Sequence, residues 1–221
     1  FFILIIFLFI NDCLGNNINI NRYISSNEIT LQIKGSNIIT ILNSNIETPS
    51  EIYINDSPQI PVNINLSTLT EGINTIRIIW SSPIRNCYSM FYGLNTIVNI
   101  DLSKFDSSEV TSMASMFENC YVLESINLNN LNTSKVKDMN NMFSECRALK
   151  SLNLSNFNTS LVTNMENMFL GCNSIKNLDL KSFNTTLVNN MFRMFYWCNN
   201  LESLNVNSFD TSSVTNMALM F

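Results

Sequence analysis

Apolar positions in this chain recur every 26 residues. The pair Met-Phe occurs at 90–91, 116–117, 142–143, 168–169, 194–195 and 220–221. A second methionine column lies three residues before these pairs, at Met113, Met139, Met165, Met191 and Met217, and the two sets contain all eleven methionines. A fixed period of this size is typical of repeat proteins, in which each unit is one supersecondary element stacked on its neighbours.

Each unit contains two different apolar patterns, as residues 123–148 illustrate. Ile126 and Leu128 alternate with polar residues, which predicts a short strand. The second set lies at offsets 0, 3, 6, 7 and 10 and consists of Val136, Met139, Met142, Phe143 and Cys146. On a helix these offsets fall within an arc of roughly 120°, which is one apolar stripe. The pattern therefore predicts a strand, a turn and a helix in each unit.

A column of hydroxyl residues marks the expected start of each helix. It contains Ser82, Ser108, Ser134, Ser160, Thr186 and Ser212. These side chains can accept hydrogen bonds from the free N–H groups of a first helical turn, and Pro83 follows where proline is favoured. The predicted fold class is an α/β solenoid, a leucine-rich-repeat-like stack of 26-residue strand-turn-helix units. We expect it to span residues 81–221, with about five repeats and a truncated C-terminus.

The preceding residues, 17–80, lack the period and read as a β-rich N-terminal cap. The β-rich runs are Glu28–Lys34, Asn37–Leu42, Glu51–Ile54, Val62–Leu66 and Ile73–Trp80. Turn residues such as Gly35, Pro49 and Gly72 separate them. We expect a small antiparallel unit that covers the open end of the stack, with Ile73–Trp80 in the first strand position of the repeat.

The chain begins with ten apolar residues, 1–10. This run is too short to cross a bilayer and is typical of a signal peptide, so residues 1–15 are assigned as a truncated signal peptide. A buried core strand is the alternative. Cys13 lies where a lipoprotein would be acylated, but Asp12 before it disfavours that modification. The expected location is secreted or cell surface, with membrane attachment only through an anchor outside this sequence.

Composition narrows the function classes. Charged residues make up 13% of the chain and the net charge is −5, so no basic surface for nucleic acid or an anionic membrane is expected. The chain has no histidine, which removes the commonest general base, the commonest zinc ligand and every Ser-His or Cys-His nucleophile. We find no catalytic or metal-binding set and expect neither enzymatic activity nor a cofactor.

The repeat also resembles a known family. The segment Leu152–Cys172 carries its Asn-Thr-Ser, Val-Thr-x-Met and Met-Phe-x-x-Cys elements. Over Ile84–Phe221 the chain is similar to the BspA-like leucine-rich repeat family of bacterial and protist surface proteins, whose repeats also occur in mycoplasma-type lipoproteins. Departures are Cys87 in place of Met, Leu94 in the Cys position and Asn189 in place of Thr. The resemblance implies an extracellular, non-enzymatic scaffold, often linked to adhesion.

The expected strands offer a candidate binding face. Its outward residues are Asp101, Asn127, Asn153, Asp179, Asn205 and Lys181. This face is polar and without aromatics, so simple solvation is the alternative to ligand binding. Arg193 with Tyr196 and Trp197 forms a second candidate patch, unless Trp197 packs between coils.

Other polar columns have structural interpretations. Cys120, Cys146, Cys172 and Cys198 are expected to be buried free thiols rather than disulfides, because adjacent helices would pack farther apart than a disulfide spans. The column Asp106, Asn132, Asn158, Asn184 and Asp210, together with the threonine that follows, is expected to bond the backbone in turns, with calcium binding as the alternative. Asn65 is the best glycosylation candidate, if the host glycosylates.

Two functions remain open from the sequence. The first is a secreted or cell-surface scaffold that binds a protein or glycan ligand in adhesion or recognition. The second is a structural stalk or targeting module of a larger exported protein whose active domain lies beyond residue 221.

Overall fold

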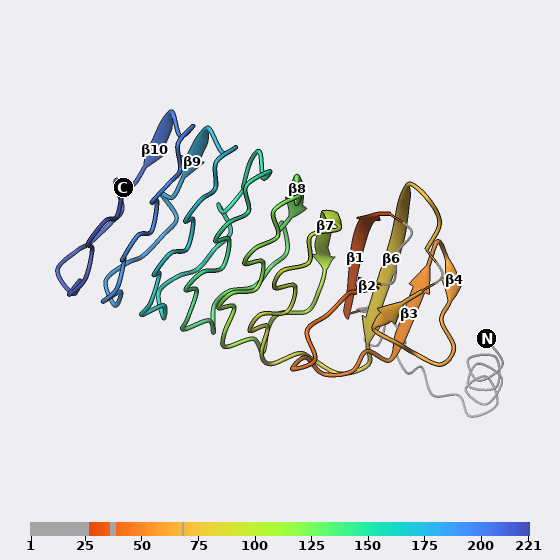
Figure 1. Cartoon of the computed structure of the whole chain (residues 1–221). Coiled ribbons are helices and arrows are strands. Elements are labelled where there is room, and N and C mark those ends of the chain that lie inside the picture. Colours follow the sequence, from red (N-terminus) through yellow and green to blue (C-terminus); the bar gives the residue numbers. More distant parts are fainter. Residues whose placement is uncertain (1–26, 36–38, 68) are drawn as a thin grey trace, which may run out of the picture.

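The computed structural model describes residues 27–35, 39–67 and 69–221. The predicted signal peptide, 1–15, and Cys13 lie outside these residues, as does the start of the predicted cap. The described part contains ten strands and no helix. An antiparallel sheet forms one end of the molecule, and a row of stacked coils extends from it (Figure 1).

The N-terminal sheet is built from runs in which buried and exposed residues alternate. Its long strands are β1 (Asn27–Lys34), β3 (Glu51–Ile54) and β6 (Ile73–Trp80), and β4 (Ser57–Pro58) is short. β1 pairs with β6, β6 with β3 and β3 with β4, all antiparallel. The strands β2 (Ile39–Thr40) and β5 (Asn65–Leu66) form a separate two-stranded sheet. The predicted antiparallel pairing is therefore confirmed for the described strands.

One strand links this sheet to the coils. The sheet has the order β4-β3-β6-β1-β7-β8, where β7 is Ile97–Lys104 and β8 is Ser125–Asn127. β1 therefore lies between β6 and the first coil, which corrects the expectation that Ile73–Trp80 would hold that position. Strands pair with β1 on both sides, and its inward side chains Ile29, Leu31 and Ile33 are fully buried in the hydrophobic core.

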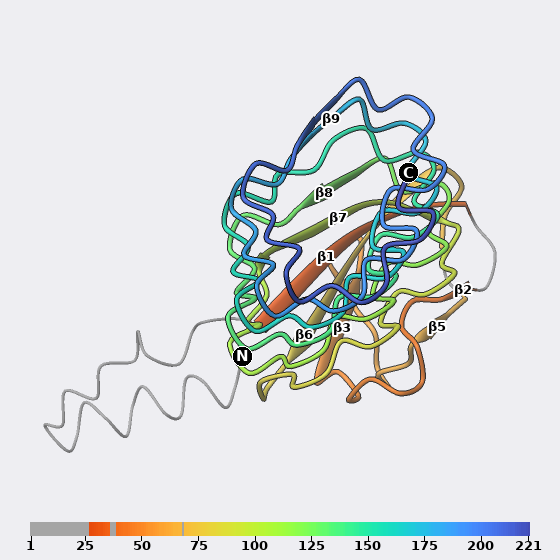
Figure 2. The ribbon, with the colours of Figure 1, turned by 90° about the vertical axis from the view of Figure 1, so that its left-hand side faces the viewer.

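The remaining coils stack in parallel. β8 pairs with β7, and β10 (Ser203–Asn205) pairs with β9 (Asn177–Asp179), each with the residue 26 positions away. A second line of parallel bridges joins Ser112, Asp138, Asn164, Asn190 and Asn216. Seen along the stack, the coils lie over one another with their strands on one side (Figure 2).

The predicted helices are wrong, and with them the α/β class: the described chain is β-rich with mixed sheets. Between Val136 and Cys146 the backbone makes consecutive tight turns instead. Met142 N–H donates to the Met139 carbonyl at 3.2 Å, and Cys146 N–H to the Phe143 carbonyl at 3.1 Å. Asn141 and Glu145 have φ of 55° and 61°, values that a right-handed helix does not contain.

The neighbouring coil explains this outcome. In a helix the N–H groups beyond the first turn would bond within their own segment. Here Phe143 N–H donates to Met168 O of the next coil at 3.0 Å, and Glu145 N–H donates to Leu170 O at 2.6 Å. A series of turns repeats its inward side chains about every three residues, so it produces nearly the same apolar spacing as a helical stripe.

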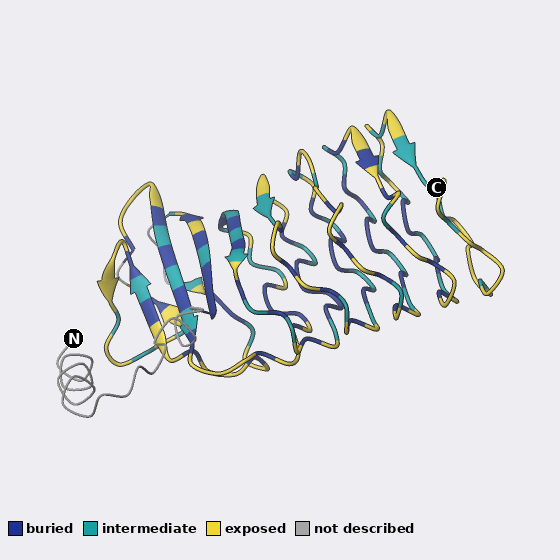
Figure 3. Cartoon of the chain, turned by 180° about the vertical axis from the view of Figure 1, so that it is seen from behind, coloured by how far each residue is buried: buried dark blue, intermediate teal, exposed yellow. Residues whose placement is uncertain are grey.

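The inward columns form one continuous core. Nine of the eleven methionines are fully buried, and the exceptions are Met217 and Met220 in the last coil. Phe91, Phe117, Phe143, Phe169 and Phe195 stack face to face, with ring centroids 5.4 to 5.9 Å apart. Buried positions recur along the coils, except in the last one, which is half-buried or exposed throughout (Figure 3). The prediction that the Met and Phe columns are core is confirmed.

Candidate functional site

The structure brings the predicted strand-face residues together in one column. Asn127 Nδ2 donates to Asp101 Oδ1 at 3.0 Å, and Asn205 Nδ2 donates to Asp179 Oδ1 at 2.9 Å. Asn153 lies one coil beyond Asn127 and is exposed. Lys181 Nζ lies 3.2 Å from Asp179 Oδ2.

The same side chains also hold the backbone. Each of these Asp and Asn side chains accepts, through Oδ1, the main-chain N–H of the residue two positions later. The donors are Ser103, Asn129, Ser155, Lys181 and Asn207, at 2.8 to 3.2 Å. Such bonds define Asx turns. The pKa of Asp179 is lowered, first by the Lys181 N–H and then by the Lys181 ammonium. The column is therefore rigid, and much of its hydrogen-bonding capacity is used internally.

The strand face does not stop at the first coil. Register places Tyr53 opposite Arg77, Arg77 opposite Thr30, and Thr30 opposite Asp101. Because opposed residues of a sheet share a side, Asp101 lies in one row with an arginine and a tyrosine of the N-terminal sheet. The Arg77 guanidinium lies 4.8 Å from the Tyr53 ring centroid. Sequence reasoning missed this row because the insertion of β1 has no 26-residue signal.

A buried carboxylate joins the sheet to the first coil. Glu28 in β1 is 4% exposed, and its oxygens lie 3.2 Å from Arg77 Nη2 and 3.3 Å from Lys104 Nζ. Burial raises the pKa of Glu28, but the hydrogen bonds from Arg77 and Lys104 outweigh it, so the pKa is lowered overall. The ion pairs therefore hold β6, β1 and β7 together.

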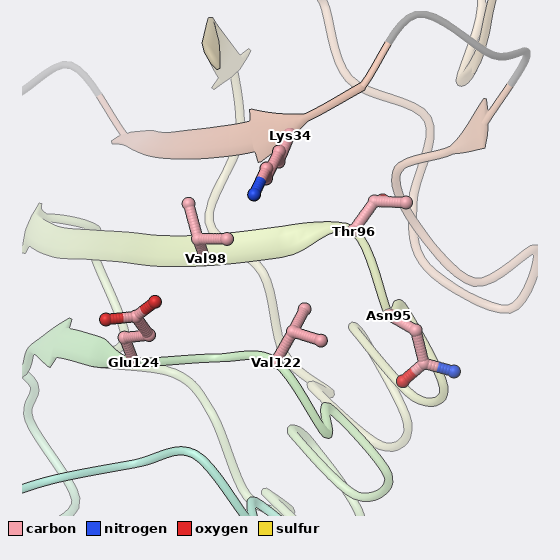
Figure 4. Close-up of a pocket in the computed structure, with 6 residues that line it drawn as sticks. All are labelled: Lys34, Asn95, Thr96, Val98, Val122 and Glu124. Carbon is pink, nitrogen blue, oxygen red and sulfur yellow. The ribbon is translucent and has the colours of Figure 1, made fainter. Parts of the chain in front are cut away.

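A shallow cavity of about 270 Å³ opens at the same junction. Lys34 extends from the end of β1 toward β7, and Glu124 lies across from it before β8 (Figure 4). Asn95, Thr96, Val98 and Val122 complete the lining. Glu124 Oε2 is paired with Lys150 Nζ at 2.6 Å, which lowers the pKa of the carboxyl. The cavity has room for a small polar group, and the Lys34 ammonium contributes to lowering the pKa of Glu124.

The four predicted thiols form a column inside the stack. Cys120, Cys146 and Cys172 are buried, Cys198 is half-buried, and all four are unpaired. Each Sγ–H donates to a phenylalanine carbonyl of the preceding coil at 3.1 to 3.2 Å. Burial raises the pKa of Cys120 to about 12 and that of Cys198 to about 11. The thiols are therefore protonated and chemically inert at neutral pH.

The turn column that allowed a calcium interpretation bonds the backbone. Oδ1 of Asp106, Asn132, Asn158, Asn184 and Asp210 accepts the N–H of Ser108, Ser134, Ser160, Thr186 and Ser212 at 2.9 to 3.0 Å. The expected turn role is confirmed. The hydroxyl residues therefore follow an Asx turn and do not cap helices. Within the described residues there is also no group of three or more acidic or cysteine side chains that could hold a metal ion.

The residues that follow the turn column form a second, buried hydroxyl column. Thr159 Oγ1 donates to the Asn184 carbonyl and accepts the Asn184 N–H, both at 2.8 Å. Thr133 and Thr185 make the same pair of bonds to Asn158 and Asp210. The expectation that these threonines bond the backbone is confirmed, and the groups they bond lie on the next coil.

Asn65 is exposed in β5. Its Oδ1 accepts a hydrogen bond from Thr40 Oγ1 at 2.6 Å. The side chain is therefore accessible to a modifying enzyme, and its amide nitrogen is free of hydrogen bonds within the described structure.

The side of tight turns carries the exposed aromatic residues of the coils. Tyr88, Tyr92, Tyr121 and Trp197 are 36 to 55% exposed. The Arg147 guanidinium lies over Tyr121 at 4.8 Å from the ring centroid. The Arg193 guanidinium lies over both Phe192 and Tyr196. Trp197 does not pack between coils, so the second candidate patch is open to solvent.

Comparison with protein families matches residues 71–152 and 150–221 to the family described as "Mycoplasma protein of unknown function, DUF285". The two matches cover more than half of the chain. The chain belongs to this family. Comparison with curated proteins gave no match, and comparison with solved structures gave none.

The DUF285 matches begin just before β6 and extend to the last coil. They therefore contain the whole coil stack, whereas β1 and β3 precede them. Within the residues that the structure describes, no helix has the length and apolarity needed to cross a bilayer.

Proposed function

We propose that this chain is a secreted or cell-surface repeat scaffold that binds a protein or glycan ligand in adhesion or recognition, without catalysis. The observation that carries the proposal is the polar face that runs over β3, β6, β1, β7 and β8 and on along the coils. The predicted signal peptide supports export. The resemblance to BspA-like surface repeats supports the adhesive role.

The rigidity of the strand face favours binding. A flexible surface loses side-chain entropy when a ligand orders it, and a pre-organised surface avoids most of that cost. Asx turns and bonds between coils already fix the side chains of Asp101, Asn127 and Asp179. Tyr53 and Arg77 add the residue types that most often anchor interfaces.

The alternative function is a structural stalk or targeting module. It is favoured by the extent to which the strand-face oxygens are used inside the coils. A stalk needs a stable stack but no ligand, so a binding measurement separates the two functions.

The test blocks the strand face without removing any turn. Gln32 and Ser151 are exposed, and register and repeat place them in the row that contains Asn99 and Ser125. We expect the wild type to bind a member of a glycan array or a panel of purified matrix proteins. Binding should weaken at least tenfold in Gln32→Arg/Ser151→Arg. The matched control is Leu161→Arg, at an exposed position outside this row, which should bind normally. A folded wild type that binds nothing on either panel would support the stalk.

A further inference from the structure

One coil carries a cluster of aromatic and cationic side chains on the side of tight turns. The Arg193 guanidinium carbon lies 4.6 Å from the ring centroid of Phe192 and 5.5 Å from that of Tyr196. Tyr196 stacks on Trp197 with centroids 5.3 Å apart and planes at 21°. Trp197 is 55% exposed, so the cluster presents an indole ring beside a positive charge.

Arg193 differs from the other arginines that stack on rings. Arg77 over Tyr53 is paired with Glu28, and Arg147 over Tyr121 is paired with Glu145 at 2.6 Å. No carboxylate of the described residues lies within ion-pair distance of Arg193, and its buried Nε has no hydrogen-bond partner. In the adjacent coil, Glu166 is engaged by Asn190 Nδ2 at 2.8 Å. The third arginine therefore lacks the carboxylate that the other two have.

The backbone at this cluster is unfavourable for large side chains. Arg193 and Trp197 have φ of 53° and 61°, in the left-handed region that bulky residues seldom occupy. In earlier coils the Arg193 column contains Ser89, Ser115, Asn141 and Asn167, and the Trp197 column contains Gly93, Asn119, Glu145 and Gly171. Positive φ recurs at these two columns in the other coils, so it belongs to the repeat backbone, and this coil differs in carrying large side chains at both positions.

We propose that this cluster binds a carboxylate-bearing sugar residue of an acidic glycan. The guanidinium pairs with the sugar carboxylate through two parallel hydrogen bonds. The indole of Trp197 packs against the C–H face of the ring, whose small positive partial charge suits the negative face of an aromatic ring. The inference rests on the proposed binding function, and it names the ligand class for a surface other than the strand face.

Neighbouring polar groups favour a sugar over a peptide. Asn199 and Asn200 follow Cys198 and are exposed. Asn200 Nδ2 donates to the Asn173 carbonyl at 2.7 Å, which leaves its Oδ1 and the amide of Asn199 to bond hydroxyl groups. An extended peptide would instead need free main-chain groups. Those groups are used between coils here: Gly171 N–H donates to Tyr196 O at 2.8 Å, and Arg193 N–H donates to Ala218 O at 3.1 Å.

The test uses tryptophan fluorescence of the full chain. Trp80 is 4% exposed and bonded to the Glu47 carbonyl, so quenching by a ligand reports on Trp197. The probe is a short oligogalacturonate, and its carboxyl-reduced, neutral counterpart is the comparison. We expect the uronate to bind at least tenfold more tightly than the neutral oligosaccharide.

The variants come from the repeat itself, so the backbone accepts them. Arg193→Asn and Trp197→Gly place in this coil the residues that earlier coils carry at the same positions. Each should weaken uronate binding at least tenfold, measured by calorimetry for Trp197→Gly, which loses the fluorescent reporter. Arg147→Asn removes another ring-stacked arginine and should leave binding unchanged.

Four results would overturn the proposal. They are equal binding of the neutral oligosaccharide, equal binding of a sulfated oligosaccharide or an acidic peptide, no binding of the uronate, and loss of binding in Arg147→Asn. If Gln32→Arg/Ser151→Arg abolishes uronate binding while Arg193→Asn does not, the scaffold function stands and this site is refuted. If neither panel of the strand-face test yields a ligand but the uronate binds here, the strand face fails and this site stands.

Discussion

The N-terminal sheet and the coil stack bury apolar side chains equally well but pair them differently. In the sheet, Leu31 lies opposite Ile76 on one side and Ile100 on the other, and each contact is particular to its place. In the coils, a buried residue meets its own counterpart one unit later, as Phe143 meets Phe117 and Phe169. A coil therefore depends on its neighbours for its core contacts and for alternate main-chain hydrogen bonds, which makes the stack a chain of coupled interfaces.

The junction shows how the two kinds of pairing are joined. Asn27 at the start of β1 accepts the Asp106 N–H through Oδ1 at 3.0 Å. In later coils the hydroxyl of Ser107 or Thr133 makes the corresponding bond to Asn132 or Asn158. The sheet thus supplies the first coil with the hydrogen bond that a preceding coil would otherwise provide.

The largest effect is expected from breaking the phenylalanine column. Phe143→Ala removes a fully buried ring that stacks on both sides, so the free energy of unfolding should fall by about 3–5 kcal/mol. Urea unfolding followed by circular dichroism measures the loss. Phe221→Ala is the control, because that ring is 72% exposed, and it should cost less than about 1 kcal/mol. Equal losses in the two variants would contradict a column that stabilises the stack from within.

A smaller effect is expected from the buried hydroxyl column. Thr159→Val keeps the side-chain shape but leaves the N–H and the carbonyl of Asn184 without partners, which should cost about 2 kcal/mol. Thermal unfolding of Thr163→Val provides the comparison, since this exposed hydroxyl makes only a 3.3 Å bond to the Lys137 carbonyl. If the two variants unfold at the same temperature, the buried hydroxyl contributes no more to stability than the exposed one.

The smallest effect is expected at the junction, where Glu28→Gln removes a carboxylate charge. Arg77 and Lys104 are partly exposed, with side-chain exposures of 33% and 65%, so solvent screening limits the loss to about 1 kcal/mol near neutral pH. Because the pKa of Glu28 is lowered on folding, its stabilisation is present above the ordinary glutamate pKa. It is lost as the pH falls through the folded-state value.

The measurement is the difference in unfolding free energy between wild type and Glu28→Gln across an acid titration. The difference should shrink toward zero at low pH. A difference that stays constant down to strongly acidic pH would show that the loss of stability in Glu28→Gln does not come from the ion pairs. A Glu124→Gln control alters an exposed pair and should leave stability nearly unchanged, because solvent screens that pair.

Sequence analysis identified different features of the two regions. In the sheet, alternation located β1, β3 and β6 closely, because a half-buried strand has a period of two. It did not place β1 between β6 and β7, since pairing partners far apart in the chain leave no local signal. The strand-face residues were also recognised as one column, but the neighbouring Tyr53 and Arg77 were not, for the same reason.

The sequence by itself determined the length of the repeat and which side chains face inward, because a core of stacked columns requires the same residue type every 26 positions. Only the tertiary structure decided the backbone of each unit. Helix and consecutive turns bury Val136, Met139, Met142 and Cys146 with nearly the same spacing, and they differ in where the N–H groups find acceptors. Alternate N–H groups find them on the next coil, as Phe143 does on Met168, so the stack forms turns in place of a helix.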